Sequence, residues 1–355
     1  MRADYLKLIA FRNYAALELR PNERLTMLVG GNAEGKTSVI EAIFMLACGR
    51  SHRTVKDGEL VNWGSAGAYS RLDFTRGGRA RRVELKIYKN GKKQGKADGL
   101  PLTRMGDLIG CFNAVMFSPE DLRLVKDGPG ERRRFMDMEL SQIRPQYFFA
   151  ISKYARALSM RNALLKEMAA GKKGDELDEF DAMLCSLGSE IISMRREFVT
   201  TIGELAEHTH ARITDGEKLG VIYRPDVLED RLPEIIAAGR AEDIKRGATQ
   251  RGPHKDDILL TIGGNDVRSY GSQGQQRTAA LSLKLSELEL VRQEAGEWPL
   301  LLLDDVMSEL DETRQKRLVQ AIGNCQTMLT CTQLDKRLAR YGEVYRVQSG
   351  SAERV

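Results

Sequence analysis

The sequence lacks the patterns that mark secreted, zinc-binding or membrane-embedded proteins. Its 5 cysteines are scattered and form no Cys-x-x-Cys pair, which indicates neither a disulfide framework nor a zinc site. No apolar run is long enough to span a bilayer, and Arg2, Asp4 and Lys7 stand among the first residues. We therefore expect no signal peptide and no membrane partner, and a reduced, cytoplasmic setting.

A strong net charge is also missing. The chain carries 55 Lys and Arg against 50 Asp and Glu, a formal net charge of +5. This mildly basic balance permits nucleic acid as a partner without requiring it. At 355 residues the chain exceeds the size at which single cores stop growing, so we expect two domains or lobes.

One stretch near the start has the pattern of a phosphate-binding loop. An apolar strand leads into Gly-x-x-x-x-Gly-Lys-Thr, and an apolar helix follows it. Such loops direct backbone N–H groups at phosphates at the positive end of a helix. Lys36 would contact the β- and γ-phosphates as a catalytic residue, and the Thr37 hydroxyl would bind Mg²⁺. The flanking elements argue against a chance glycine turn. The predicted ATP-binding residues are Gly30, Gly31, Asn32, Ala33, Glu34, Gly35, Lys36, Thr37 and Ser38.

The other half of a nucleotide site is predicted near the opposite end of the chain. Four consecutive leucines follow Pro299, which is typical of a parallel strand covered on both faces. The strand ends in Asp304, the predicted Mg²⁺ carboxylate, and in Asp305, a catalytic base that would orient the attacking water. The nucleotide fold would therefore be closed by two distant parts of the chain.

Two groups of alternating strands surround these motifs in sequence. The first, within 5–20, predicts a small antiparallel sheet. The second, 69–96, predicts a strongly basic meander with turns at Gly77-Gly78 and Asn90-Gly91. Its cationic hairpin tips suit a nucleic-acid backbone, and they equally suit protection against edge-to-edge aggregation. Arg53, behind the phosphate loop, has two open interpretations: a nucleotide or interface contact, or a solvated helix end.

The middle of the chain is helical. Apolar residues recur every three or four positions over 147–168 and again from Glu176, which predicts an antiparallel helical hairpin with Arg161 on its outer face. His208 and His210 would point apart on a helix, so a metal site is not favoured. His254, beside Pro253 and two acids, is expected to be a structural or interface residue rather than a base.

A family resemblance appears in the segment 113–137. Its Phe, Pro and Asp-Leu, the Gly-Pro-Gly turn, the arginines Arg132 to Arg134 and the final Phe-x-Asp resemble the RecF family of bacterial recombination-repair ATPases. Residues 11–14, 51–54 and 251–257 resemble the same family. From the residues alone, the arginine cluster would be solvated or phosphate-facing.

The resemblance implies an α/β fold: an ABC-type P-loop ATPase head with an inserted helical lobe carrying a short antiparallel coiled-coil-like arm. We expect residues 1–118 and 249–355 to form the ATPase lobe and residues 119–248 the arm lobe.

A polar, glycine-punctuated loop precedes the long helix that leads to the carboxylate strand. It resembles the signature loop of ABC-type ATPases, which binds the γ-phosphate of ATP held by the opposite subunit. A helix N-terminus suits that role, although an ordinary helix cap by Ser272 is the alternative. The predicted residues acting in trans are Ser272, Gln273, Gly274 and Gln275.

The residues after Asp305 follow the ABC-type pattern with departures. Residues 306–311 resemble the loop that communicates across such dimers, and a helix over 312–322 precedes a strand over 326–332. Thr330 and Thr332 stand where that group usually has a histidine, so the γ-phosphate contact is left open. Asp305 replaces the glutamate usual in transporters, and no clear lid glutamine is found.

Together these motifs predict an ATP-driven clamp, a weak ATPase in DNA replication, repair and the damage (SOS) response. ATP and Mg²⁺ would close a homodimer on double-stranded DNA or single-strand gap junctions, and slow hydrolysis would release it. The resemblance implies cooperation with RecO and RecR in loading RecA. Two alternatives are the nucleotide-binding subunit of another ABC-type assembly, such as a transporter, and a small-molecule kinase.

Overall fold

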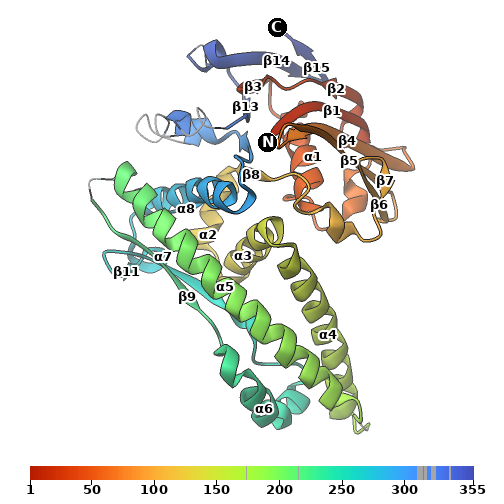
Figure 1. Cartoon of the computed structure of the whole chain (residues 1–355), viewed down its shortest axis with the longest axis vertical. Coiled ribbons are helices and arrows are strands. Elements are labelled where there is room, and N and C mark those ends of the chain that lie inside the picture. The colour runs from red at the N-terminus through yellow and green to blue at the C-terminus, as the bar shows by residue number, and fades with distance from the viewer. Residues whose placement is uncertain (173, 215, 310–314, 316–317, 321–324, 336) are drawn as a thin grey trace. The chain divides into compact units, whose positions relative to one another are not determined.

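We describe a computed structural model of the chain, covering residues 1–355 except 173, 215, 310–314, 316–317, 321–324 and 336 (Figure 1). The chain divides into two compact units, residues 1–122 with 284–355, and residues 123–283. The expected division into 1–118, 119–248 and 249–355 stays a prediction about domains. It differs from the compact units in residues 249–283, which belong to the same unit as the helices.

The first unit contains a six-stranded sheet in the order β15-β14-β3-β13-β12-β8. All neighbours pair in parallel except the β14–β15 hairpin. All five residues of β12 are buried, as the leucine run predicts for a strand covered on both faces. The strands are β3 (Leu25–Val29), β8 (Ala114–Phe117), β12 (Leu300–Asp304), β13 (Thr327–Cys331), β14 (Gly342–Gln348) and β15 (Ser351–Arg354).

A second, antiparallel sheet in this unit has the order β2-β1-β4-β5-β6-β7. It joins the two strand groups that the sequence suggested separately, because β1 pairs with both β2 and β4. The predicted antiparallel sheet and basic meander are therefore parts of one sheet. Its strands are β1 (Arg2–Phe11), β2 (Tyr14–Leu19), β4 (Gly67–Arg76), β5 (Arg79–Tyr88), β6 (Lys93–Ala97) and β7 (Leu100–Pro101).

Helix α1 (Lys36–Cys48) contacts strands of both sheets. Every residue of α1 except Thr37 is buried, which explains why the segment is apolar all round rather than amphipathic. Short 3₁₀ turns connect the strands of the unit: η1 (Asp57–Leu60), η2 (Met105–Leu108), η3 (Pro119–Leu122), η6 (Val306–Glu309) and η7 (Leu338–Tyr341). The helix expected over 312–322 lies largely outside the described residues.

The second unit is dominated by helices. The predicted hairpin is formed by α4 (Pro145–Ala169) and α5 (Leu177–Ile213), which contact each other. At about 1.5 Å per residue, the 37 residues of α5 span roughly 55 Å. The unit also contains α2 (Arg123–Lys126), α3 (Pro129–Ile143), η4 (Glu229–Arg231), α6 (Leu232–Arg246), η5 (Pro253–Lys255) and α7 (Val267–Tyr270).

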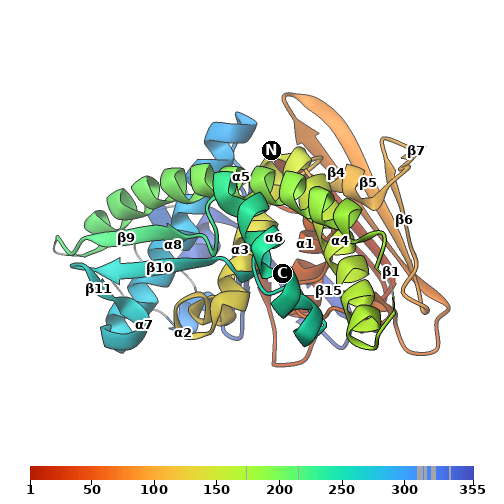
Figure 2. The same ribbon diagram turned by 90° about the horizontal axis from the view of Figure 1, so that it is seen from below.

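A three-stranded sheet, β11-β10-β9, lies beside α5, and its strand β9 contacts that helix (Figure 2). Its strands are β9 (Leu219–Arg224), β10 (Asp257–Ile262) and β11 (Asn265–Asp266). The strand predicted over 258–262 is thus paired within this unit. Helix α8 (Gln273–Ala295) begins in the second unit and ends in the first.

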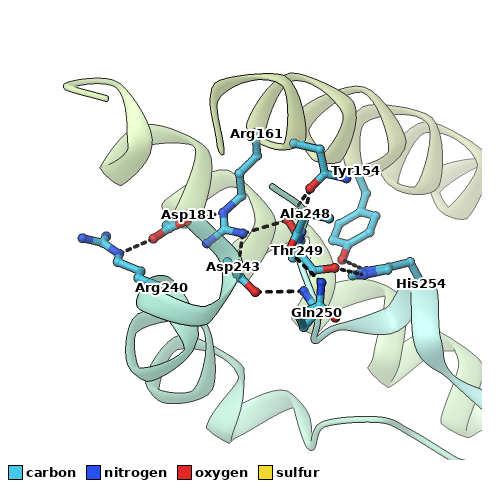
Figure 3. A network of polar contacts seen from close by, with 10 residues as sticks. Tyr154, Arg161, Asp181, Arg240, Asp243, Ala248, Thr249, Gln250 and His254 are labelled. Atoms are coloured by element: carbon cyan, nitrogen blue, oxygen red, sulfur yellow. Dashed lines mark hydrogen bonds and ion pairs between the residues drawn. The ribbon is translucent and has the colours of Figure 1, made fainter. Parts of the chain in front are cut away.

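Arg161 corrects one prediction, because it is fully buried and does not lie on the outer face of α4 (Figure 3). Its Nε donates to Asp181 at 2.6 Å, and its Nη1 donates to Asp243 and to Thr249, both at 2.7 Å. The carboxylates on α5 and α6 compensate the buried charge, which a buried arginine requires. Arg161 therefore ties three helices and the loop after α6 together.

His254 has a structural environment, in line with its interpretation from the sequence. Its Nδ1 lies 2.9 Å from the Tyr154 hydroxyl, and its Nε2 lies 3.2 Å from the Thr249 carbonyl oxygen (Figure 3). Burial lowers the pKa of His254, which favours the neutral imidazole. The ring therefore links α4 to the loop that also contacts Arg161.

Three general expectations can be compared with the described residues. None of the helices there is long and apolar enough to cross a membrane. The five cysteines form no disulfide with one another. No group of three His, Cys, Asp or Glu side chains there is placed to hold a metal ion, and His210 instead lies 2.9 Å from the Ser282 hydroxyl.

Candidate nucleotide-binding site

The predicted phosphate loop connects β3 to α1, and two of its glycines are required by close packing. A Cβ on Gly30 would lie 2.2 Å from the Val347 carbonyl oxygen. Gly35 has φ of 115°, and a Cβ there would lie 2.5 Å from the Asn13 side chain. Any larger residue at either position would push the loop out of place.

Side chains from the β1–β2 turn and from the start of β2 hold the loop in this conformation. Asn13 Nδ2 donates to the Glu34 carbonyl at 2.9 Å, and the Tyr14 hydroxyl donates to the Gly35 carbonyl at 3.2 Å. From the β14–β15 turn, the backbone N–H of Ser349 donates to the Glu34 carboxylate. The segment 11–14, which carries part of the family resemblance, thus supports the loop directly.

Lys36 is folded into the loop rather than extended into solvent. Its Nζ donates to the Gly30 carbonyl at 2.9 Å and to the Gly31 carbonyl at 2.8 Å, and the residue is 4% exposed. The adjoining loop residues Asn32 and Ala33 line a pocket, and Ser38 lies in the first turn of α1. Of the nine predicted ATP-binding residues, six line this pocket, and Gly30 and Gly31 accept hydrogen bonds from Lys36.

The two predicted Mg²⁺ ligands lie next to each other, although 267 residues separate them in sequence. The Thr37 hydroxyl donates to Asp304 Oδ1 at 2.9 Å. Because β3, β13 and β12 run in parallel, the loop after β3 and the end of β12 meet at the same edge of the sheet. Hydroxyl and carboxylate oxygens are the donors that Mg²⁺ prefers, and this ion usually completes its shell with water and phosphate oxygens. The donor set suits Mg²⁺.

Thr330 is a member of this site that the sequence did not assign. Its hydroxyl donates to Asp304 Oδ1 at 2.8 Å and accepts from the Asp305 backbone N–H at 2.9 Å. Thr330 lies on β13 directly opposite Asp304 in the parallel register. The sequence shows a threonine where ABC-type proteins usually have a histidine. It does not show that Thr330 contacts Asp304, because that contact depends on the pairing of β12 with β13.

Asp305 follows the strand with φ of 52°, a left-handed conformation that Asp tolerates better than most residues. It lines a pocket of about 550 Å³ together with Lys36 and Thr37. That volume is within the range of small-molecule sites. The predicted base thus faces the same space as the phosphate loop. The remaining lining residues are Arg12, Asn13, Asn32, Ala33, Gly35, Ser38, Arg53, Glu59, Val61, Asn62 and Trp63.

A buried carboxylate, Glu41 on α1, supports the cationic side of the pocket. Arg12 makes two hydrogen bonds to it, at 2.9 and 2.7 Å, and Arg53 Nη1 lies 3.8 Å from it. Burial would raise the pKa of Glu41, but hydrogen bonds from Arg12 and Ser51 outweigh burial, and the pKa is lowered. Both arginines are therefore held at the pocket by one ionised group that no motif in the sequence singles out.

The predicted signature loop lies at the N-terminus of α8 in the second unit. The Ser272 hydroxyl accepts from the Gln275 N–H at 3.2 Å, and the Gln275 side chain accepts from the Ser272 N–H at 2.9 Å. This reciprocal cap is the ordinary role considered for Ser272. Residues Ser272, Gln273 and Gly274 are exposed, so this helix end is accessible. Action in trans stays a prediction.

These features together define a P-loop ATPase head of the ABC and SMC type. The sequence matches the model of the RecF/RecN/SMC N-terminal domain family over residues 4–351, and the chain belongs to this family. It is 44% identical to the DNA replication and repair protein RecF of Alkaliphilus oremlandii over 348 residues, 94% of each chain. It is 38% identical to the RecF protein of Clostridium kluyveri over the whole of both chains.

Solved structures agree with this assignment. The structure of the recombination mediator protein RecF with ATP, in the RecFOR pathway, has a TM-score of 0.93 and 35% identity, covering all of this chain and 97% of that one. An SMC head bound to the C-terminal winged-helix domain of ScpA has a TM-score of 0.58 at 15% identity, which shows a shared fold alone. The predicted ABC-type head with an inserted helical region is thereby confirmed.

Proposed function

We propose that this protein is an ATP-dependent DNA clamp in recombination, repair and replication. Two chains would enclose two ATP molecules, each held by Gly30 to Thr37, Asp304 and Asp305 of one chain and by Ser272 to Gln275 of the other. The Thr37–Asp304 hydrogen bond carries this proposal, because it joins the phosphate loop to the carboxylate strand at one pocket. The relatives described as RecF support the biological setting.

Within one chain, each side chain has a defined part. Lys36 would exchange its two loop carbonyls for the β- and γ-phosphates, a stronger charge-assisted interaction. Thr37 and Asp304 would hold Mg²⁺, which neutralises phosphate charge when bound. Asp305 would orient the attacking water from the strand end. Hydrolysis in such a clamp serves as a timer, so a low turnover is expected.

The exposed N-terminus of α8 supports the contribution of a second chain. A helix N-terminus carries a partial positive charge, which attracts the γ-phosphate, and Ser272 to Gly274 are exposed at this one. Binding energy gained only when ATP lies between two chains would shift the equilibrium toward the closed dimer. After hydrolysis that gain would be lost, and the dimer would open.

DNA contacts are proposed for the antiparallel sheet, with a smaller cationic surface than the sequence indicated. Asp73 accepts from both Arg71 and Arg82, and Arg81 pairs with Asp98. These ion pairs neutralise part of the basic block. We expect the lysines at the hairpin tips to contribute most to phosphate binding. Cooperation with RecO and RecR and the loading of RecA are proposed from the family resemblance, and the solved relative is a recombination mediator of the RecFOR pathway.

The proposal is tested by DNA binding of the Asp305→Asn variant, in which hydrolysis should be slowed and ATP retained. Fluorescence anisotropy of labelled gapped duplex would be measured at moderate salt with Mg²⁺ and ATP, ADP or no nucleotide. We expect tighter binding with ATP than with ADP, and a preference for gapped over continuous duplex. If the affinity for DNA did not depend on the nucleotide, the clamp proposal would be wrong. That result would not bear on ATP binding itself.

A further inference from the structure

Trp63 is the one aromatic side chain among the described residues that line the nucleotide pocket. The residue is 93% exposed, the highest value among the large apolar residues of the described chain. An exposed indole in the lining of a pocket offers a bound ligand a large, flat apolar surface. The other lining residues indicate which ligand would cover it.

The main chain at Trp63 is fixed although its indole is exposed. The neighbouring Asn62 donates through its backbone N–H to the Ala10 carbonyl at 2.8 Å, and through its Nδ2 to the Arg12 carbonyl at 2.6 Å. Arg12 returns a backbone hydrogen bond to the Leu60 carbonyl at 2.7 Å. Because Asn13 in turn holds the phosphate loop, the loop that carries Trp63 is tied to the phosphate site through one short segment.

The pocket lining combines polar and cationic side chains, such as Lys36, Thr37 and Arg53, with one indole. A nucleoside triphosphate combines the complementary groups, a charged polyphosphate and a flat aromatic base. Aromatic side chains stack on bases with useful affinity, and stacking tolerates every base because each has a π-face.

We propose that Trp63 forms the nucleobase subsite of this pocket by stacking its indole on the base of the bound nucleotide. The inference rests on the proposed ATP site and adds to it the residue that distinguishes a nucleotide from a bare polyphosphate. Stacking would cover the exposed indole in each chain before any second chain or DNA binds.

Intrinsic fluorescence provides the direct test, since the sequence has only 2 tryptophans. The other, Trp298, stacks with Arg292 and would be replaced by Phe so that Trp63 is the only tryptophan. Mg²⁺-ATP should quench and shift this emission, and Mg²⁺ with inorganic tripolyphosphate should not. The quench should be unchanged over a hundredfold range of protein concentration, without DNA.

Affinity provides the second arm. Trp63→Ala should weaken ATP binding roughly tenfold, while tripolyphosphate binding stays as in the parent protein, and Trp63→Phe should restore most of the loss. Val55→Ala is the matched control, because Val55 is 91% exposed and does not line the pocket. It should change neither affinity.

The outcomes separate this inference from the proposed function. ATP affinity unaffected by Trp63→Ala, or equal quenching by ATP and tripolyphosphate, would overturn the nucleobase subsite and leave the ATP site intact. Quenching that grows with protein concentration would assign Trp63 to an interface between copies and likewise overturn it. Failure of both ATP and tripolyphosphate to bind would overturn the nucleotide site itself.

Discussion

Asp304 accepts hydrogen bonds from two threonine hydroxyls, on Thr37 and on Thr330. The first joins it to the phosphate loop, and the second fixes it to the neighbouring strand. Groups that orient a metal ligand without touching the metal commonly matter nearly as much as the ligand. At the scale of single residues, therefore, the position of the carboxylate depends on a hydroxyl that the motif does not include.

Removing this hydroxyl gives a prediction for Thr330→Val. The substitution keeps the shape but leaves Asp304 Oδ1 one donor short and the partly buried Asp305 N–H without its acceptor. We expect the Mg²⁺ concentration needed for half-maximal ATP binding to rise roughly tenfold. It would be measured by titrating Mg²⁺ at fixed ATP with a fluorescent nucleotide competitor.

Thr332→Val is the matched control for this experiment, because Thr332 follows the same strand and is exposed. It should bind Mg²⁺-ATP as the wild type does. If Thr330→Val showed the same Mg²⁺ dependence as this control, the hydroxyl would have no part in positioning Asp304.

At the scale of elements, the sequence predicted best what depends on local pattern. The leucine run of β12, the phosphate loop before α1 and the 3.6-residue period of α4 and α5 were all recognisable. Strand pairing was harder to predict. The sequence did not indicate that β1 joins the two antiparallel groups, or that β9 pairs with β10. Such pairings are set by tertiary packing between distant segments, which local periodicity does not encode.

Arg161 and Glu41 show the same limit for side chains. An arginine at a polar position of a helical pattern is usually solvated, and the partners that bury Arg161 lie 20 and 82 residues away. Glu41 lies inside an apolar helix and is held by Arg12, 29 residues before it. A buried charge becomes predictable only when its counter-charge is placed, and that requires the fold.

The Arg161 cluster predicts a large effect on the stability of the helical unit. Arg161→Met would leave the buried Asp243 without this cation, while Asp181 keeps its ion pair with Arg240. Breaking a buried ion pair in this way typically costs about 3–5 kcal/mol. Adding Asp243→Asn to this variant should recover part of the loss, because one uncompensated charge is removed. Urea unfolding followed by circular dichroism would give the free energies.

Arg156→Met serves as the comparison, since Arg156 lies on the same helix and is exposed. Its free energy of unfolding should stay within about 0.5 kcal/mol of the wild type. An Arg161→Met protein as stable as the Arg156→Met protein would show that the buried ion pairs do not hold the helices together.

At the scale of the whole molecule, the central question is whether each nucleotide site is shared between two chains. The phosphate loop belongs to one compact unit and the signature loop to the other. A shared site predicts that defects in the two loops complement each other, whereas a site confined to one chain predicts that they do not. Two variants with opposite defects can therefore decide between these arrangements.

Lys36→Ala should lose ATP binding, because the pocket loses its central cation. Ser272→Arg should bind ATP but fail to dimerise, since a large side chain would block the exposed N-terminus of α8. Loss of the Ser272 cap should lower the free energy of unfolding by about 1 kcal/mol. Unfolding measurements would check that the variant is still folded. Each variant alone should then be inactive as an ATPase.

Mixing the two variants should restore activity. A mixed dimer pairs the intact phosphate loop of the Ser272→Arg chain with the intact signature loop of the Lys36→Ala chain, which gives one complete site. We expect ATP hydrolysis in the mixture to exceed the sum of the separate proteins, with a mixed dimer detected by analytical ultracentrifugation in ATP. If the mixture hydrolysed ATP no faster than that sum, or if Ser272→Arg alone still dimerised with ATP, the shared site would be wrong and ATP would act within a single chain.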